Sequence, residues 1–178
     1  MKRIYLIGYM GAGKTTLGKT LAQQMNLNYI DTDHFIENRY RKKIRDIFAT
    51  EGEYRFREIE HRILLEISEF EDIVISTGGG FPCFNNNMVI MNNTGITVYL
   101  EASVEELTAR LDASKNVRPV LQNRSGDELE AFIKDSINVR KTFYEQANIR
   151  FQVLSKVTKK DVERLAKELD KELITSSL

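Results

Sequence analysis

The segment Gly8–Thr15 has the residue types and spacing of a phosphate-binding loop. Its sequence, Gly-Tyr-Met-Gly-Ala-Gly-Lys-Thr, matches the pattern G-x-x-x-x-G-K-[ST]. Glycines allow successive backbone N–H groups to turn toward phosphate oxygens. The ammonium group of Lys14 adds a full positive charge, and the hydroxyl of Thr15 can ligate Mg²⁺. These residues therefore predict binding of ATP together with Mg²⁺.

This loop is meaningful only between a strand and a helix, and the neighbouring residues predict both. The apolar run Ile4–Ile7 ends at a glycine and is typical of a buried parallel strand. After the loop, Leu17 and Leu21 follow at helical spacing. The positive end of the helix dipole would then face the phosphates. A chance glycine-rich turn carrying a lysine is the alternative, and this context disfavours it.

A second candidate group, Asp31-Thr32-Asp33, follows a predicted short strand. Side chains at positions i and i+2 of an extended chain point to the same side, so both carboxylates can face the cleft beyond the sheet. One of them can hold Mg²⁺ through water, and the other can hydrogen-bond an acceptor hydroxyl. The alternative is that an aspartate here serves as the N-cap of the following helix.

Three glycines, Gly78–Gly80, follow another predicted strand, and their backbone can approach a substrate closely. A flexible turn is the alternative. Arg57, Arg118 and Arg140 can each grip a carboxylate or phosphate in a bidentate fork. Spacing alone does not distinguish any of these arginines from a solvated surface residue. Tyr9, within the phosphate-binding loop, receives no role.

Strands alternate with helices along the chain. Strands are predicted near 4–7, 28–31, 72–76, 96–100 and 149–154, and helices near 14–25, 33–40, 53–70, 104–111, 127–148 and 159–173. This order predicts an α/β protein with a parallel sheet covered on both faces. Ser103 and Glu106 form a capping-box pattern. The polar stretch from Asp112 to Asp127 is either a surface loop or a lid over a charged ligand.

Length and composition favour one soluble domain. The chain has 178 residues and 42% hydrophobic residues, and 26 basic residues balance 26 acidic ones. This balance disfavours a nucleic-acid partner. A single cysteine excludes an internal disulfide and favours a reducing compartment. We expect a cytoplasmic protein without a signal peptide or membrane partner, and a monomer because no heptad pattern is sustained.

Taken together, these motifs resemble the shikimate kinase family, from the phosphate-binding loop to about residue 147. The remaining markers are G-E-x-x-F-R at Gly52–Arg57, R-P-[LV]-L at Arg118–Leu121 and R-x-x-x-Y at Arg140–Tyr144. The resemblance implies a three-layer P-loop kinase fold with a five-stranded parallel sheet flanked by helices. It also implies a single domain over 1–178, with acceptor-binding helices at about 33–65 and a lid at about 112–126. The implied reaction is ATP-dependent phosphorylation of the 3-hydroxyl of shikimate, in the biosynthesis of aromatic amino acids.

The resemblance also assigns residues by matching position. Shikimate is expected to contact Asp33, Arg57, Gly79, Gly80 and Arg140, with the arginines on its carboxylate and Asp33 on its hydroxyls. ATP is expected to contact Gly11, Ala12, Gly13, Lys14, Thr15, Thr16, Arg110 and Arg118. Lys14, Asp33 and Arg118 would be catalytic, and Thr15 and Asp31 would serve Mg²⁺. Arg110 matches a family arginine that packs on the adenine.

Phe81 stands after the triple glycine, where a small residue is expected, and the following segment is rich in asparagine. A gluconate-type or nucleotide kinase is the alternative enzyme, because both share the phosphate-binding loop and the size. Neither is expected to carry both the Gly52–Arg57 and Gly78–Gly80 motifs. A catalytically idle ATP-binding module is the alternative outside the enzymes, and the complete set of polar residues disfavours it.

Overall fold

The structure, a computed structural model, describes residues 2–113, 121, 124–153 and 158–175. Its strands are β1 (Arg3–Ile7), β2 (Asn28–Asp31), β3 (Ile73–Ser76), β4 (Ile96–Glu101) and β5 (Ile149–Gln152). Its helices are α1 (Lys14–Met25), α2 (Thr32–Tyr40), α3 (Ile44–Ile67), α4 (Asn87–Thr94), α5 (Val104–Asp112), α6 (Gly126–Tyr144) and α7 (Lys159–Thr175), with a 3-10 turn, η1 (Phe81–Cys83). None of the helices described is long and apolar enough to cross a bilayer.

The strands form one parallel sheet in the order β2-β3-β1-β4-β5. This confirms the predicted five-stranded parallel sheet. β1 is central: the chain leaves it toward β2 on one side, and β4 lies on the other side. A sheet whose order reverses in this way has a crevice at the carboxyl ends of its strands, next to the reversal. The phosphate-binding loop follows β1 and the glycine loop follows β3, so both lie at that edge.

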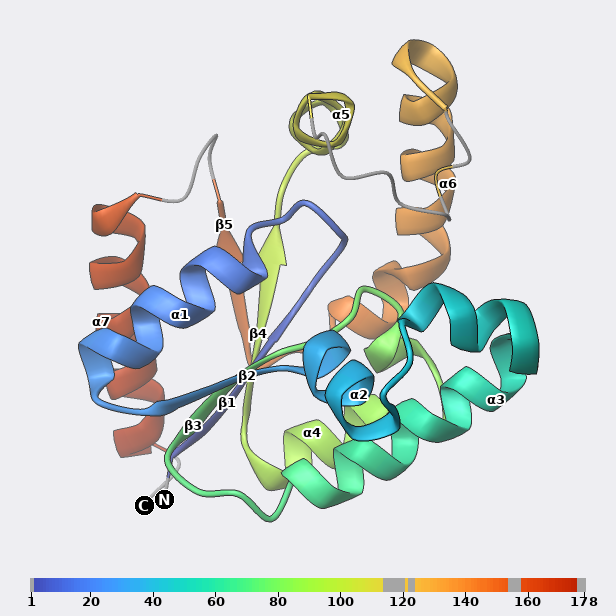
Figure 1. The fold of residues 1–178 in the computed structure, drawn as a ribbon. Helices are drawn as coiled ribbons and strands as arrows, with labels where there is room; N and C mark the ends of the chain where they lie inside the picture. Colours follow the sequence, from blue (N-terminus) through green and yellow to red (C-terminus); the bar gives the residue numbers. More distant parts are fainter. Residues whose placement is uncertain (1, 114–120, 122–123, 154–157, 176–178) are drawn as a thin grey trace.

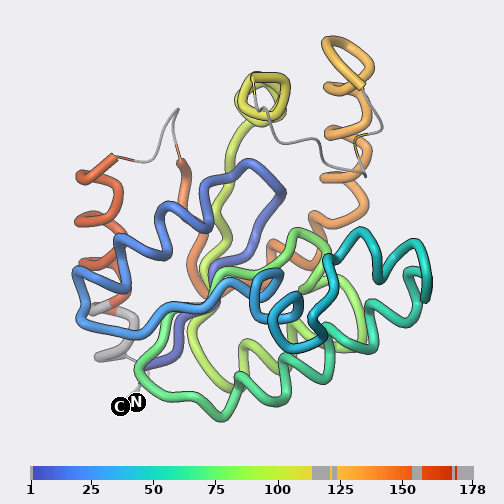
Figure 2. The backbone as a smooth tube through the Cα atoms, viewed as in Figure 1, coloured from blue at the N-terminus to red at the C-terminus, as the bar shows by residue number. Residues whose placement is uncertain are grey.

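Helices cover the sheet on both faces, as Figures 1 and 2 show. Successive side chains of β1 alternate between the faces: Ile4 and Leu6 pack on the side of α1 and α7, whereas Tyr5 and Ile7 pack on the side of α3 and α4. All four side chains are fully buried. Each face therefore carries its own apolar core, and the predicted three-layer architecture is confirmed.

Helix α3 differs from the prediction at its start. A helix was expected from residue 53, and α3 begins at Ile44 and is interrupted at Gly52, where φ is 79° and ψ is 172°. A residue with a Cβ is strained at such a positive φ, which explains why a glycine lies here. The helix then resumes at Glu53, and this second part carries Arg57 and the apolar stripe of Phe56, Ile59 and Ile63. The predicted part of the helix is present, and its first two turns were missed.

The asparagine-rich segment forms η1 and α4, neither of which was predicted. Phe81 is fully buried against the α3 side of the sheet, so the large residue after the glycines belongs to the core. Asn87 is also fully buried. Its Nδ2 donates to the carbonyl of Phe81 (2.8 Å), and its Oδ1 accepts from Nδ1 of His61 on α3 (2.8 Å). Asn87 thus fixes the turn that follows the glycine loop.

Replacing Asn87 with alanine should destabilise the fold, because the buried carbonyl of Phe81 and the partly buried imidazole of His61 would lose their partner. We expect a loss of about 1–3 kcal/mol in the free energy of unfolding, measured by urea denaturation. Asn93→Ala, on the exposed side of the same helix, is the matched control and should change stability by less than about 0.5 kcal/mol. Equal effects of the two substitutions would contradict a role for the buried amide.

Candidate active site

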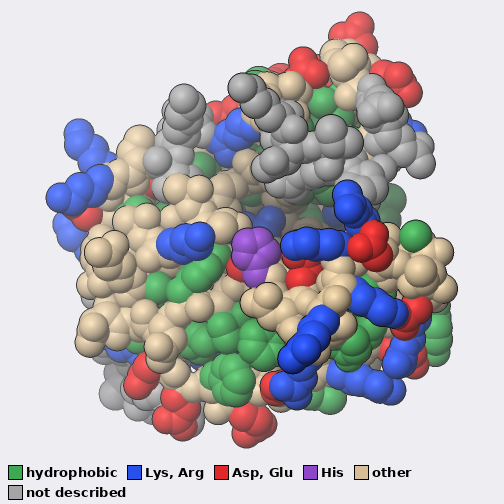
Figure 3. Space-filling view, in the orientation of Figure 1, with side chains coloured by type: hydrophobic (Ala, Val, Ile, Leu, Met, Phe, Trp, Pro, Cys, Tyr) green, Lys and Arg blue, Asp and Glu red, His purple; other side chains and the backbone are tan. Residues whose placement is uncertain are grey.

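A cleft of about 310 Å³ opens at the carboxyl edge of the sheet. Its lining combines the phosphate-binding loop after β1, the carboxylates after β2 and the glycine loop after β3, namely Met10, Gly11, Gly13, Lys14, Thr15, Thr16, Asp31, Asp33, Thr77, Gly78 and Gly79. Three motifs that are far apart in sequence therefore meet in one place. Figure 3 shows charged side chains gathered over α2 and α3, whereas the face over α1 is mostly uncharged.

Glycine conformation gives the phosphate-binding loop its shape. Gly8, Gly11 and Gly13 have positive φ values of 137°, 83° and 96°. A Cβ on Gly8 would lie 2.7 Å from the carbonyl oxygen of Leu100 on β4, so this position has no room for a side chain. Gly13 is the N-cap of α1 and provides no side-chain acceptor for the first N–H groups of that helix. These donors and the helix dipole form an anion site.

Lys14 lies at the floor of this loop and is nearly buried, with 9% of its surface exposed. Its ammonium group donates to the carbonyl oxygens of Gly8 (2.7 Å) and Tyr9 (2.8 Å). Ala12 is buried, and its N–H also donates to the carbonyl of Tyr9 (3.2 Å). The loop thus holds a positive charge inside its own curve, at the place where a phosphate group would meet it.

Asp31 is the N-cap of α2, one of the two alternatives that the sequence left open, and it also lines the cleft. Its Oδ1 accepts from the backbone N–H groups of Asp33 (3.1 Å) and His34 (3.4 Å), which makes it the N-cap of α2. Its Oδ2 accepts from the hydroxyl of Thr15 (2.9 Å). The expectation of an extended chain across residues 31–33 was wrong, because α2 begins at Thr32. Asp31 and Asp33 nevertheless both line the cleft.

The oxygen atoms of Thr15 and Asp31 fit a magnesium ion. Mg²⁺ prefers hard oxygen ligands and usually keeps several waters and substrate phosphates, so it needs only one or two protein groups. Within residues 2–113, 121, 124–153 and 158–175, no cluster of three or more acidic, histidine or cysteine residues is suited to hold a metal by itself. A magnesium ion held by Thr15 and Asp31 would take its remaining ligands from water and from nucleotide phosphates.

The glycine loop passes close to the charged ends of the acceptor-side residues, so a side chain in the loop would have to displace them. A Cβ on Gly78 would lie 2.8 Å from Oδ1 of Asp33, and one on Gly80 would lie 2.8 Å from Nη1 of Arg57. A Cβ on Gly79 would lie 3.4 Å from Nη1 of Arg140. The loop therefore brings together the acceptor-binding residues that the resemblance implied.

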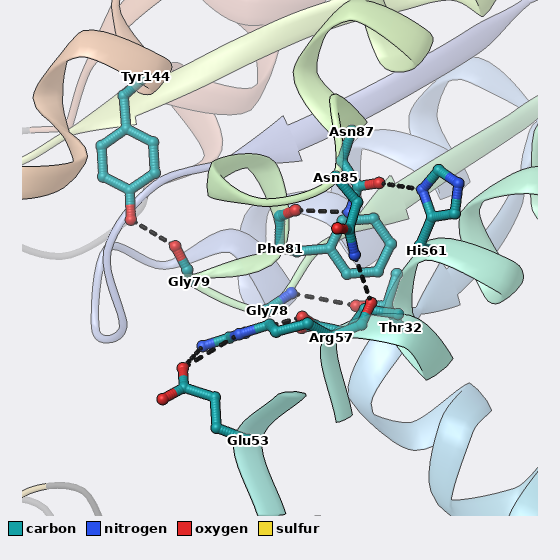
Figure 4. A network of polar contacts seen from close by, with 11 residues as sticks. Thr32, Glu53, Arg57, His61, Gly78, Gly79, Phe81, Asn85, Asn87 and Tyr144 are labelled. Atoms are coloured by element: carbon teal, nitrogen blue, oxygen red, sulfur yellow. Dashed lines mark hydrogen bonds and ion pairs between the residues drawn. The ribbon is translucent and has the colours of Figure 1, made fainter. Parts of the chain in front are cut away.

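Hydrogen bonds from two helices fix the glycine loop, as Figure 4 shows. The hydroxyl of Thr32, at the start of α2, accepts from the N–H of Gly78 (3.0 Å), and the hydroxyl of Tyr144, at the end of α6, donates to the carbonyl of Gly79 (2.5 Å). Thr32 and Tyr144 are both fully buried. The backbone that faces the cleft is therefore supported from behind.

Arg57 is held by two acids and by aromatic rings. It forms ion pairs with Glu53 (2.8 Å) and Glu60 (2.7 Å), and its guanidinium lies 4.2 Å from the ring centroid of Phe84. Glu60 is almost completely buried, and the sequence reasoning missed it. Its position three residues after Arg57, on the same helical face, is the signal that could have revealed it. Burial raises the pKa of Glu60 to about 7, although the charge of Arg57 partly opposes this effect.

The structure describes one of the two arginines that were expected to contact ATP. Arg110, on α5, donates to the carbonyl of Gly11 (3.0 Å), and its buried Nη2 has no hydrogen-bond partner among the described residues. Arg110 therefore supports the phosphate-binding loop, and its expected contact with adenine stays a prediction. Arg118 and most of the expected lid lie outside the described residues.

A phosphate-binding loop after the central strand, facing a carboxylate pair and a glycine loop, defines a P-loop kinase. The sequence model of the shikimate kinase family matches residues 10–170. The shikimate kinase of Parabacteroides distasonis is 54% identical over 96% of this chain and 99% of its own length. The chain belongs to the shikimate kinase family.

Solved structures agree with this assignment. The crystal structure of shikimate kinase from Bacteroides thetaiotaomicron is 45% identical, with a TM-score of 0.89 over 97% of this chain and 98% of that one. The structure of shikimate kinase from Acinetobacter baumannii in complex with shikimate is 33% identical, with a TM-score of 0.82 over 100% of this chain and 96% of that one.

The raised pKa of Glu60 predicts a pH-dependent stability. The folded protein keeps a proton on Glu60 between about pH 4.5 and about pH 7, whereas the unfolded chain has lost it. Stability should therefore fall as the pH rises through this window, by up to about 1.4 kcal/mol per pH unit. Glu60→Gln should lack this contribution, so its free energy of unfolding relative to wild type should increase between pH 5 and pH 7.5, roughly.

Urea denaturation at several pH values measures this difference. Glu58→Gln is the matched control, because Glu58 lies on the same helix with 37% of its side chain exposed. The free energy of unfolding of this variant should change with pH as that of the wild type does. Parallel pH profiles for wild type and Glu60→Gln would show that Glu60 does not titrate in this window.

Proposed function

We propose that this protein transfers the γ-phosphoryl group of ATP to the 3-hydroxyl of shikimate. The observation that carries the proposal is the convergence of Asp33, Arg57 and Arg140 on the glycine loop, beside the phosphate-binding loop. Two guanidinium groups suit an acceptor with a carboxylate, and a carboxylate suits one with hydroxyl groups. Shikimate has both kinds of group. The relative from Acinetobacter baumannii, solved in complex with shikimate, supports this choice of acceptor.

On the nucleotide side, Gly11, Gly13 and the N-terminus of α1 bind the phosphates through backbone N–H groups. Lys14 exchanges its two loop carbonyls for the β- and γ-phosphates and stabilises the charge that develops during transfer. Thr16 lies on the same wall of the cleft. Ala12 keeps the loop in shape through its bond to Tyr9. We assign contacts with adenine and with the transferring phosphoryl group to Arg110 and Arg118 on the resemblance alone.

Thr15 and Asp31 would hold a magnesium ion through the Thr15 hydroxyl and the Asp31 carboxylate. The metal, when bound, neutralises phosphate charge. Asp31 is suited to this role because its other oxygen is fixed by the N-terminus of α2. The same cap limits its motion, so the metal site is positioned before the nucleotide arrives.

On the acceptor side, Arg57 and Arg140 bind the carboxylate of shikimate, while the N–H groups of Gly79 and Gly80 face the shikimate ring. Asp33 accepts a hydrogen bond from the hydroxyl to be phosphorylated and orients its oxygen toward the γ-phosphate. Phosphoryl transfer depends mainly on such positioning and on charge stabilisation. The proposal also includes acceptor-binding helices at about 33–65 and a lid at about 112–126. We further propose that the protein is a monomer in the cytoplasm.

ADP release measures the proposed function directly. With ATP and Mg²⁺, release should require shikimate, and gluconate or AMP should not replace it. Lys14→Ala should lose most of the rate, about 100-fold or more, because it removes a charge that acts in the transition state. Lys19→Ala, an exposed lysine on the same helix, is the matched control. Release with gluconate or AMP would identify another kinase, and ATP binding without any release would indicate an idle nucleotide-binding module.

Arg57→Ala should mainly weaken acceptor binding. Because a charged hydrogen-bonding pair would be lost, we expect the KM for shikimate to rise roughly 10-fold to 100-fold, with little change in the KM for ATP. Arg55→Ala is the control, since Arg55 is two residues away on α3 and pairs with surface acids. An unchanged KM for shikimate combined with a large rise in the KM for ATP would reverse the role given to Arg57.

A further inference from the structure

Tyr9 is a residue of the phosphate-binding loop whose side chain receives no role from the sequence or from the proposed reaction. Its side chain is 2% exposed and packs in the apolar core that contains Leu107, Leu111 and Ile133. Its ring lies beside Arg140 of α6: the Cζ atom of the guanidinium is 5.4 Å from the ring centroid. This distance is within the range of about 6 Å for an attractive cation–π contact.

The two arginines of the acceptor side are held in different ways. Arg57 forms ion pairs with Glu53 and Glu60. In contrast, no carboxylate in the described part of the chain forms an ion pair with Arg140. An acid beside Arg140 would neutralise its charge and compete with an anionic ligand. An aromatic ring attracts the guanidinium through its face and leaves its charge for a ligand.

The backbone of Tyr9 belongs to the nucleotide side of the cleft. Its carbonyl oxygen accepts from the ammonium of Lys14 (2.8 Å) and from the N–H of Ala12 (3.2 Å). The position of its ring is therefore fixed by the phosphate-binding loop, while the group that rests on the ring faces Gly79 in the acceptor loop. One residue thus contacts both halves of the site.

We infer that Tyr9 is a positioning residue for acceptor binding: its ring holds the guanidinium of Arg140 over Gly79 with the charge available for a carboxylate. This inference rests on the proposed function. The role belongs to the ring and not to the hydroxyl, because the Tyr9 hydroxyl is buried without a hydrogen-bond partner among the described residues. Phenylalanine should therefore replace Tyr9 fully, and leucine should not.

Steady-state kinetics with shikimate and ATP test the inference. Tyr9→Leu should raise the KM for shikimate about 5-fold to 30-fold, which corresponds to about 1–2 kcal/mol, and should change the KM for ATP less than about twofold. Tyr9→Phe should keep both values and should melt at the same or a higher temperature. Phe151→Leu is the matched control. Phe151, on β5, is also 2% exposed, and its ring centroid lies 4.3 Å from the Cζ atom of Arg164. This substitution should lower the melting temperature without raising the KM for shikimate.

A double-mutant cycle separates positioning from general damage. If Tyr9 acts through Arg140, then Tyr9→Leu should have little further effect on the KM for shikimate once Arg140→Ala is present. Additive effects of the two substitutions would overturn the inference. So would a rise in the KM for ATP without one for shikimate, since the ring would then support only the nucleotide loop.

The wild-type protein in the same assay distinguishes this inference from the proposed function. If wild type releases ADP only with shikimate, the variants test Tyr9 alone. If wild type shows no shikimate-dependent release, the proposed function fails, and the role of Tyr9 in shikimate binding fails with it. Melting curves of all variants show whether a lost activity reflects unfolding.

Discussion

The close passage of the Gly78–Gly80 backbone beside three charged side chains is the constraint on which the site depends. A Cβ at Gly78 or Gly80 would lie 2.8 Å from an atom of Asp33 or Arg57, a separation that real side chains do not adopt. A side chain in the loop would have to displace these charged groups, and the loop is held in place because Thr32 and Tyr144 hydrogen-bond to it. A loop that is both thin and anchored lets a small acceptor approach the nucleotide while the backbone stays rigid.

The charge that Arg57 and Arg140 present to the cleft depends on the side chains that each of them contacts. Arg57 belongs to a network with two glutamates, one of which is buried and has a raised pKa. Such a network fixes the guanidinium firmly, but part of its charge is already compensated. Arg140 rests on a ring and keeps its charge. In the proposed complex, the two groups would offer an anionic acceptor one rigid, partly neutralised contact and one contact without a carboxylate partner among the described residues.

The sequence predicted those parts of the structure that depend on residues close to one another in the chain. The phosphate-binding loop, the five strands and the capping of α5 by Ser103, whose hydroxyl accepts from the N–H of Glu106 (3.2 Å), all follow from short-range patterns. What was missed depends on distant partners. Helix α4 is fixed by the buried amide of Asn87 against His61 on α3, and an asparagine-rich segment by itself indicates a loop. Similarly, Glu60 matters because of burial, which residue type alone does not reveal.

The order of the strands explains why one residue can contact both substrates' sites. Because β1 and β3 are neighbours, the loops that follow them lie side by side at one edge of the sheet, although about 70 residues separate them in sequence. A side chain in the first loop can then reach a group that faces the second. Tyr9 has this position, with its carbonyl on Lys14 and its ring on Arg140. A nucleotide that draws Lys14 away from the carbonyl changes the forces on the same residue that supports Arg140. The junction of two parallel strands thus allows one residue to contact both Lys14 and Arg140.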